Sequence, residues 1–261
     1  MRKAGLLAVM VFWMVGTAVS GAFAAGLIGP PQSLSRPEGG LSTAVGFAYD
    51  EEPFKGRFEH VMRAKRLFTQ AAYGKPDLWE VCGSIGLADM KLSGAFSPPG
   101  GVPAIARNDI HDDWQLFGAV GARAYYPATP WFGIGAFAQA AYHFGSYSDQ
   151  VIGLAGATPF AADMKVKQLW SLRAGIGLQA TVFDRLKLYG GPYLCHAKAR
   201  VDLAPSVSGM PLGTDADEIR NKTRAGGFAG AVIPLAKGFA VILEGRYAER
   251  FSIGSAVTYT Y

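Results

Sequence analysis

The chain has 261 residues, of which 50% are hydrophobic and 17% charged, and its formal net charge is +5. Because a soluble domain carries about a quarter charged residues, this composition argues against an ordinary cytosolic enzyme, and the high apolar fraction excludes a disordered chain. After the first two dozen residues no apolar run approaches the roughly 18 residues that a membrane helix needs, which excludes a polytopic helical membrane protein.

The first residues predict export from the cytoplasm. Arg2 and Lys3 precede an apolar stretch from residue 5 to residue 19, and Ala22-Phe23-Ala24 matches the small-x-small site of signal peptidase. We therefore expect a signal peptide over residues 1–24, with a single N-terminal anchor helix as the alternative. Loss of Arg2 and Lys3 would lower the formal charge from +5 to +3, so the basic pI gives no support to nucleic-acid binding.

Residues 25–40 are rich in proline and glycine and are expected to form an extended periplasmic lead-in. From residue 41 onward the dominant hydrophobic period is two, as expected for β-strands. In the clearest stretch, Leu172, Ile176 and Leu178 alternate with polar or small residues such as Arg173 and Gln179. The pattern predicts ten strands, over roughly 41–50, 58–73, 78–91, 114–126, 131–147, 164–183, 186–202, 221–234, 239–247 and 252–261.

The connections between these strands alternate in length. Tight turns are expected around 74–77, 127–130, 184–185 and 234–238, whereas 92–113, 148–163 and 203–220 are long and rich in Gly, Pro and Asp. Short turns that alternate with long loops are typical of an all-β, up-and-down antiparallel barrel in the bacterial outer membrane. We therefore assign residues 41–261 to a transmembrane barrel of about ten strands. An eight-stranded barrel and a soluble periplasmic β-protein are the alternatives.

In such a barrel the continuous apolar face points toward lipid and the other face lines the lumen. The strand phases assign ten polar residues to the lumen, namely Glu80, Arg123, Gln139, Lys167, Arg173, His196, Lys198, Arg224, Glu244 and Arg246. Barrels of eight to ten strands are usually filled by side chains. A plugged lumen would be filled by Arg123, Arg173, Glu80, Glu244 and Phe137, whereas an open one would hold water and paired charges.

Aromatic residues gather near both ends of the expected strands. Trp79, Trp131 and Tyr259 border the tight turns, while Trp114 and Trp170 lie at the other end. Two such bands match the aromatic girdles of membrane barrels, because amphipathic rings prefer the headgroup layer.

With its signal peptide, alternating strands, loop lengths and girdles, the chain resembles the small outer-membrane β-barrel proteins of Gram-negative bacteria. The end of the chain, Val257-Thr258-Tyr259-Thr260-Tyr261, looks like the C-terminal assembly signal of that family, with Val257, Tyr259 and Tyr261 on one face. Tyr261 departs from the commoner terminal Phe. The resemblance implies an outer-membrane location and the barrel-assembly machinery as a partner, with lipid and lipopolysaccharide around the barrel. It identifies an architecture and not a chemistry.

Two functions remain open at this point. The first is a non-enzymatic barrel, either structural and surface-exposed or a narrow channel for small solutes, without cofactor or metal. The second is an enzyme at the extracellular rim, since omptin proteases are ten-stranded barrels of this family that use Asp and His at that place. His111 or His60 with Asp109, Asp113 or Asp217 would form such a site. Cys82 and Cys195 are expected to lie on opposite faces of the sheet and to remain unpaired.

Overall fold

The computed structural model describes residues 27–34, 39–55, 59–75, 78–93, 110–155, 158–183, 186–221 and 223–261. The predictions for residues 1–26, for Asp109 and for most of the 92–113 connection therefore concern residues outside the described ranges. The described part is all-β, with the strands β1 (Gly40–Lys55), β2 (Glu59–Lys75), β3 (Trp79–Ser93), β4 (Ile110–Thr129), β5 (Phe132–His143), β6 (Tyr147–Ala155), β7 (Thr158–Val182), β8 (Leu186–Val207), β9 (Met210–Pro211), β10 (Asp215–Arg220), β11 (Arg224–Pro234), β12 (Phe239–Tyr247) and β13 (Phe251–Thr260). Within this part of the chain, no helix is long and apolar enough to cross a membrane.

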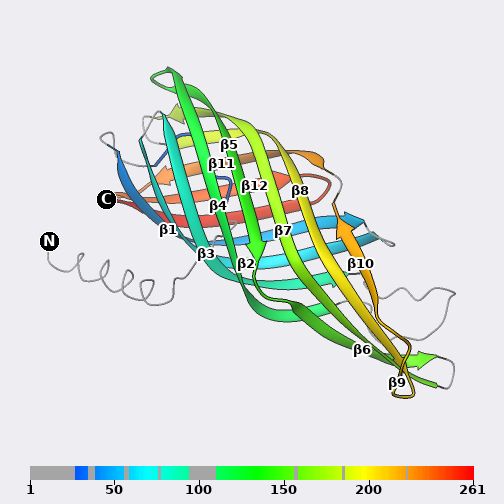
Figure 1. Ribbon diagram of the computed structural model, residues 1–261. Helices are drawn as coiled ribbons and strands as arrows, with labels where there is room; N and C mark the ends of the chain where they lie inside the picture. The colour runs from blue at the N-terminus through cyan, green and yellow to red at the C-terminus, as the bar shows by residue number, and fades with distance from the viewer. Residues whose placement is uncertain are drawn as a thin grey trace, which may run out of the picture.

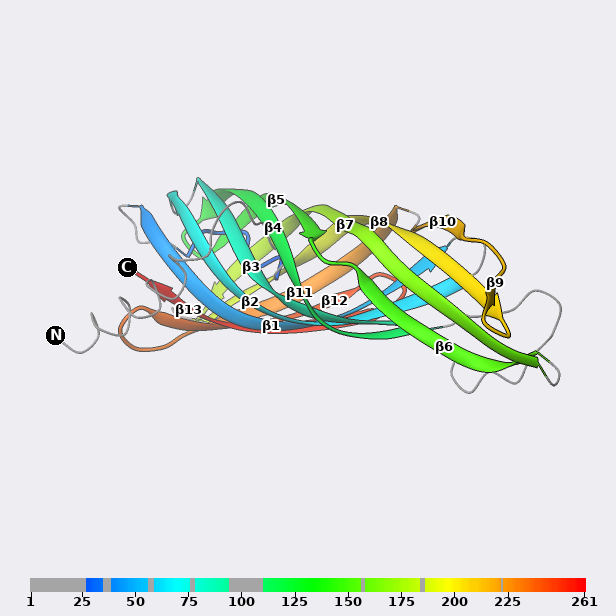
Figure 2. The ribbon, with the colours of Figure 1, turned by 60° about the horizontal axis from the view of Figure 1, so that its bottom comes forward.

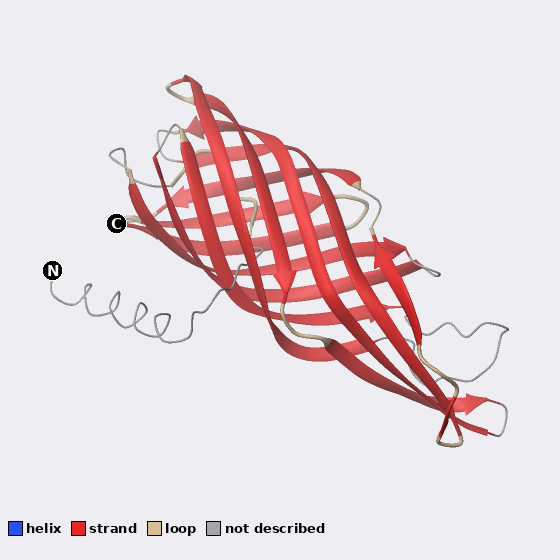
Figure 3. Cartoon of the chain, viewed as in Figure 1, coloured by secondary structure: helices blue, strands red, loops and turns tan. Residues whose placement is uncertain are grey.

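Ten of these strands close into a ring by antiparallel pairing. The order runs β8-β11-β12-β13-β1-β2-β3-β4-β5-β7, and β7 pairs with β8 to close it (Figures 1 and 3). The predicted ten-stranded barrel is confirmed. The C-terminus and the tight turns β4–β5, β7–β8 and β11–β12 lie at one end, which we call the turn end.

Side chains alternate between the outside and the inside of the ring. The outward residues near the turn end are apolar and half exposed, with Val45, Leu67, Val81, Leu87, Leu116, Ile134, Ile176, Leu194, Leu243 and Ile253 between 41% and 58% exposed. The inward positions of the same strands carry Glu80, Arg123, Arg173 and Glu244, all at most 9% exposed. This polarity is the reverse of a water-soluble barrel, and it makes a continuous apolar band around the outside.

Away from the turn end, the barrel continues as a narrow β-extension that we call the projection (Figure 2). It is built from β6, β9, β10 and the far parts of β7 and β8, because β6 pairs with β7, β7 with β8, and β8 with both β9 and β10. The expectation of loops over 148–163 and 203–220 is therefore wrong. These segments satisfy their backbone groups by strand pairing, and β7 with its 25 residues is far longer than the 9–11 residues that cross a bilayer.

At the base of the projection and within it, the interior is apolar and the outside is charged. Met62, Met90, Leu92 and Ile110 on β2, β3 and β4, and Val166 on β7, belong to one buried cluster that runs from the barrel into the projection, each at most 2% exposed. Lys65, Asp89, Lys165, Arg200 and Asp202 occupy outward positions of the same strands. Polarity thus inverts along the barrel axis, as expected where the wall leaves an apolar solvent and enters water.

A bulge in β7 marks this inversion. The pairing of β7 with β8 shifts register between Lys167 and Trp170, and Gln168 has a φ of +53°. We expect Gln168→Val to lower the free energy of unfolding by about 1–2 kcal/mol, because a β-branched residue is strained in the left-handed region. Gln168→Asn is the matched control and should leave stability unchanged, since Asn tolerates this conformation. Urea midpoints of the refolded barrel in detergent would measure both, and equal midpoints would contradict the strain.

Candidate functional site: a filled lumen

The segment 27–34 lies inside the barrel and fills its lumen near the turn end. Leu27 and Ile28 are 6% and 4% exposed, and both belong to a buried cluster with Phe68, Phe117 and Phe228. The expectation of a periplasmic lead-in is thus corrected for these residues. The reason is that apolar residues flanked by Gly and Pro can enter a lumen whose polar wall satisfies their backbone groups. We call this segment the plug.

Ionised side chains of the barrel wall bind the plug backbone. The Glu244 carboxylate accepts hydrogen bonds from the N–H groups of Ile28 (3.0 Å) and Gly29 (2.7 Å). On the opposite wall, Arg123 Nη1 donates to the Pro30 carbonyl at 2.6 Å. Such charge-assisted bonds are about twice as strong as neutral ones, so they hold the plug in one register.

The same wall residues pair with one another and with the plug side chains. Arg123 Nε lies 3.1 Å from Glu80 Oε1, and Ser33 Oγ donates to Glu80 Oε2 at 2.7 Å. The Gln139 amide donates to the Leu27 carbonyl at 3.4 Å. The plug therefore replaces the water that these charges would otherwise need.

Two glycines of the wall make room for the plug. A Cβ at Gly135 or at Gly177 would come within 2.7 Å of the Pro31 ring. Gly135 of β5 and Gly177 of β7 thus present hydrogen atoms to Pro31, while the preceding residues, Ile134 and Ile176, point to the outside. Phe137 lies beside them and packs edge-on against Phe228 at 5.4 Å.

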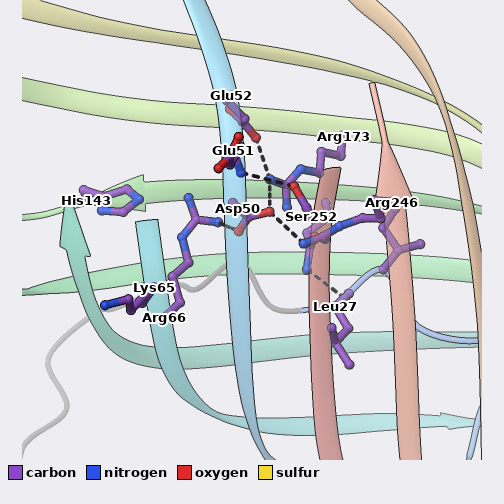
Figure 4. A network of polar contacts seen from close by, with 12 residues as sticks. Leu27, Asp50, Glu51, Glu52, Lys65, Arg66, His143, Arg173, Arg246 and Ser252 are labelled. Carbon is purple, nitrogen blue, oxygen red and sulfur yellow. Dashed lines mark hydrogen bonds and ion pairs between the residues drawn. The ribbon is translucent and has the colours of Figure 1, made fainter. Parts of the chain in front are cut away.

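A cluster of buried charges closes the lumen beyond the plug (Figure 4). Asp50 is 1% exposed, and its two carboxylate oxygens meet three arginines. Arg246 Nη2 and Arg173 Nη2 lie 2.7 Å and 3.4 Å from Oδ1, and Arg66 Nη1 lies 2.9 Å from Oδ2. Glu52 adds a second carboxylate at 2.7 Å from Arg173. We call these five residues the Asp50 cluster.

The charges of this filled region balance. Four buried arginines (Arg66, Arg123, Arg173, Arg246) pair with four buried carboxylates (Asp50, Glu52, Glu80, Glu244), and a fifth, Arg224, pairs with Glu249, whose side chain is exposed. Balance is required here, because an unpaired charge inside a narrow lumen would carry its full desolvation cost. Cavities of about 20 Å³ and 10 Å³ remain beside the plug and the Asp50 cluster, each with room for about one water molecule.

Three predicted lumen residues lie on the outside of the barrel instead. Lys167 is displaced by the Gln168 bulge and pairs with Asp202 at 2.9 Å. On β8 the buried residues are Cys195, Ala197 and Ala199, so His196 and Lys198 point outward. Charged side chains are expected to face the lumen only within the apolar band. Beyond the band the outside of the wall faces water, so charged side chains lie there as well.

The remaining predicted lumen residues are inward. Glu80, Arg123, Gln139, Arg173, Arg224, Glu244 and Arg246 are all between 2% and 9% exposed. Cys82 and Cys195 are free, but both occupy inward positions, which corrects the expectation of opposite faces. That error has the same origin, because the phase of β8 was reversed.

The set of lumen residues predicted from the sequence does not contain Asp50, Glu52 and Arg66. The alternation of β1 contains a signal for the two acids, because Ser42, Ala44, Gly46 and Ala48 precede Asp50 and Glu52 at every second position. A strand predicted to end at residue 50 leaves Glu52 outside this alternation.

The predicted girdle residues lie on the outside of the barrel. Trp79, Trp114 and Trp131 are 44%, 43% and 61% exposed, and Trp170 and Tyr259 are half-buried at outward positions. At the chain end, Tyr259 packs between Phe239 and Tyr261, each ring at 4.8 Å, and Val257 is outward.

Of the rim residues considered for catalysis, His111 and Asp217 lie on separate parts of the wall. His60 is buried, His111 is exposed on β4, and Asp217 is exposed on β10. The strands β6, β7 and β8 lie between β4 and β10 along the wall of the projection. Nor do the described residues include a group of three or more His, Cys, Asp or Glu that could hold a metal ion. The side chain of Asp113 is outside the described set.

Comparison with known proteins gives architecture alone. No family model and no curated protein matches the chain. Among solved structures it is similar to the translocator domain of the autotransporter NalP from Neisseria meningitidis, with 12% identity, coverage of 100% of this chain and 98% of that one, and a TM-score of 0.42. It is also similar to the toluene transporter TbuX of Ralstonia pickettii (13% identity, 84% and 88% covered, TM-score 0.39) and to the attachment invasion locus protein Ail of Yersinia pestis (13%, 84% and 93%, TM-score 0.30). Such values assign no function.

Proposed function

We propose that this protein is a closed barrel of the bacterial outer membrane, without enzymatic activity, that carries a rigid β-projection on the cell surface. The turn end would face the periplasm and the projection would face the medium. The apolar outer band, bordered by Trp79 and Trp131 at one edge and by Trp114 and Trp170 at the other, supports the membrane location.

The filled lumen is the observation that favours a structural, surface-exposed role over transport. Three layers follow one another along the axis: the plug, the Asp50 cluster and the apolar interior of the projection. Each layer is packed, and the two cavities among them hold about one water molecule each. A solute would have to displace buried ion pairs, which costs several kcal/mol for each ion left unpaired.

Recordings in planar lipid bilayers test closure directly. The refolded mature chain should insert, shown by heat-modifiable migration on gels, and should give no single-channel steps under applied voltage. Discrete steps of reproducible size would overturn the closed barrel and favour the narrow channel instead.

Export and assembly complete the proposal. A signal peptide over residues 1–24 would deliver the chain to the periplasm. The barrel-assembly machinery would recognise β13, whose outward face carries Val257 and Tyr259, together with Tyr261, which follows the strand. Fractionation of the full chain with the outer membrane tests the location; recovery in the soluble periplasmic fraction would contradict it.

A further inference from the structure

A groove of about 650 Å³ opens on the outer surface where the apolar band meets the projection. The side of the groove nearer the turn end is aromatic and consists of Tyr142 and Trp170. The side nearer the projection is polar and includes Gln168, Lys198 and Arg200. The bulge of β7 lies at this groove, because Gln168, which has a positive φ, is one of the residues that line it.

A row of cations runs sideways from this groove across three strands. Lys198 of β8 lies directly opposite Arg220 of β10, which in turn lies opposite Lys55 of β1. All three point outward, since Ala197, Ile219 and Phe54 beside them are buried at 1% to 3% exposure. Side chains directly opposite on neighbouring strands have Cβ atoms about 4.5–5.5 Å apart, and like charges at that distance are destabilising.

Carboxylates compensate this row only in part. Glu218 pairs with Lys198 at 2.6 Å, and Asp202 pairs with both Lys167 and Arg200. Asp217 also lines the groove. In the register of β1 and β2, Glu59 lies directly opposite Lys55. Among the described residues no carboxylate forms an ion pair with Arg220, whose two neighbours in the row are both lysines.

The position of the row along the barrel axis, at the edge of the apolar band, indicates which kind of anion it can bind. Trp170 lies directly opposite Lys198, and the next outward residue of β7 toward the turn end is Leu172, 46% exposed in the apolar band. A ligand that fills the groove therefore contacts apolar and aromatic side chains on the side of the turn end, and guanidinium and ammonium groups on the side of the projection. This is the distribution of a phosphorylated lipid at the membrane surface, whose acyl part lies below its phosphate.

From this geometry we propose that the groove and the Lys198–Arg220–Lys55 row bind the phosphate group of an outer-leaflet glycolipid, with Arg220 and Lys198 on the phosphate and Trp170 and Tyr142 against the sugar and acyl parts. The proposal rests on the outer-membrane location given above, and it adds a defined lipid site. Arg220 suits this role because its planar guanidinium can bind two phosphate oxygens at once.

Binding of bisphosphorylated lipid A to the refolded mature protein in detergent, followed by native mass spectrometry, tests the site. The double variant Lys198→Gln/Arg220→Gln should lose at least about tenfold in affinity, because two charge-assisted contacts are removed. Lys65→Gln, an exposed lysine on the outer face of β2, is the matched control and should bind as the wild type does. Dephosphorylated lipid A should bind the wild type as weakly as the intact lipid binds the double variant.

Three results would overturn the proposal: equal affinity of the double variant and the wild type, equal affinity for dephosphorylated lipid A, or inorganic phosphate bound as tightly as the lipid, which would identify a site for the free anion. Circular dichroism and heat-modifiable migration verify that each variant is folded. The binding assay is independent of cellular location, so failure of the lipid site and failure of the outer-membrane assignment are read from separate experiments.

Discussion

Replacement of Asp50 by asparagine is expected to lower the free energy of unfolding by about 3–5 kcal/mol, because it breaks a buried ion-pair network by removing one partner. Asp50 is 1% exposed and compensates Arg66, Arg173 and Arg246 at the centre of the lumen. Asparagine keeps the shape of the side chain, so the change isolates the charge. Arg66, Arg123, Arg173 and Arg246 would then pair with three buried carboxylates instead of four.

The matched control is Asp89→Asn, the same change on the outer face of β3. Asp89 lies 3.8 Å from Lys65, whose side chain is 57% exposed, and such surface pairs contribute about 0–1 kcal/mol. Urea unfolding in detergent, monitored by tryptophan fluorescence, would compare the two variants with the wild type. A second change, Arg66→Met in the Asp50→Asn background, should recover part of the loss, because it removes one uncompensated cation. Equal midpoints for Asp50→Asn and Asp89→Asn would show that the Asp50 cluster does not carry this cost.

The barrel itself could be predicted from the alternation of apolar and polar residues, because lipid outside and a polar lumen inside impose opposite chemistry on successive residues. Within the band, the two faces of β7 can be assigned from the alternation of apolar Leu172, Ile176 and Leu178 with polar Arg173 and Gln179. The rule fails where the wall leaves the apolar band. There Met164 and Val166 are inward and Lys165 is outward, so a charge no longer identifies the lumen.

The bulge at Gln168 lies where the apolar band ends and the wall with a charged outer face begins. The sequence does not predict this bulge. One extra residue shifts the phase, so Lys167 and Arg173 fall on opposite faces although both have odd numbers. A strand pattern with constant period assigns every residue after such an irregularity to the wrong face.

The plug was missed for a different reason. Leu27-Ile28-Gly29-Pro30-Pro31 has no strand period, and its conformation is determined by distant partners, Glu244 being more than 200 residues away in the chain. Segments without local structure are placed by tertiary contacts alone, which a one-dimensional pattern does not contain. The many polar and charged residues assigned to the lumen indicated only that something inside the barrel had to satisfy their hydrogen bonds.

The second large effect is expected from deletion of residues 27–34, with residues 1–26 left unchanged. The deletion removes the burial of Leu27 and Ile28, about 1.5–3 kcal/mol for each side chain, and leaves the Glu244 carboxylate without two backbone donors. The two free cysteines then report where the lumen opens, because Cys82 lies near the plug, between Glu80 and Ser84, and Cys195 lies opposite Arg173 in the layer of the Asp50 cluster.

In the folded wild type, both thiols should react slowly with a charged maleimide. In the deletion variant, Cys82 should react at least about tenfold faster, since access of reagent limits the reaction of a buried thiol. Cys195 should stay slow, because the Asp50 cluster still separates it from the turn end. A variant with an eight-residue Gly-Ser segment in place of residues 27–34 keeps the chain length and should behave as the deletion does, because the loss lies in the specific contacts of the plug. If Cys82 reacts as slowly in both variants as in the wild type, the wall charges close the lumen without the plug. If the reaction of Cys195 accelerates together with that of Cys82, the three layers form one cooperative unit, and the Asp50 cluster depends on the plug for its packing.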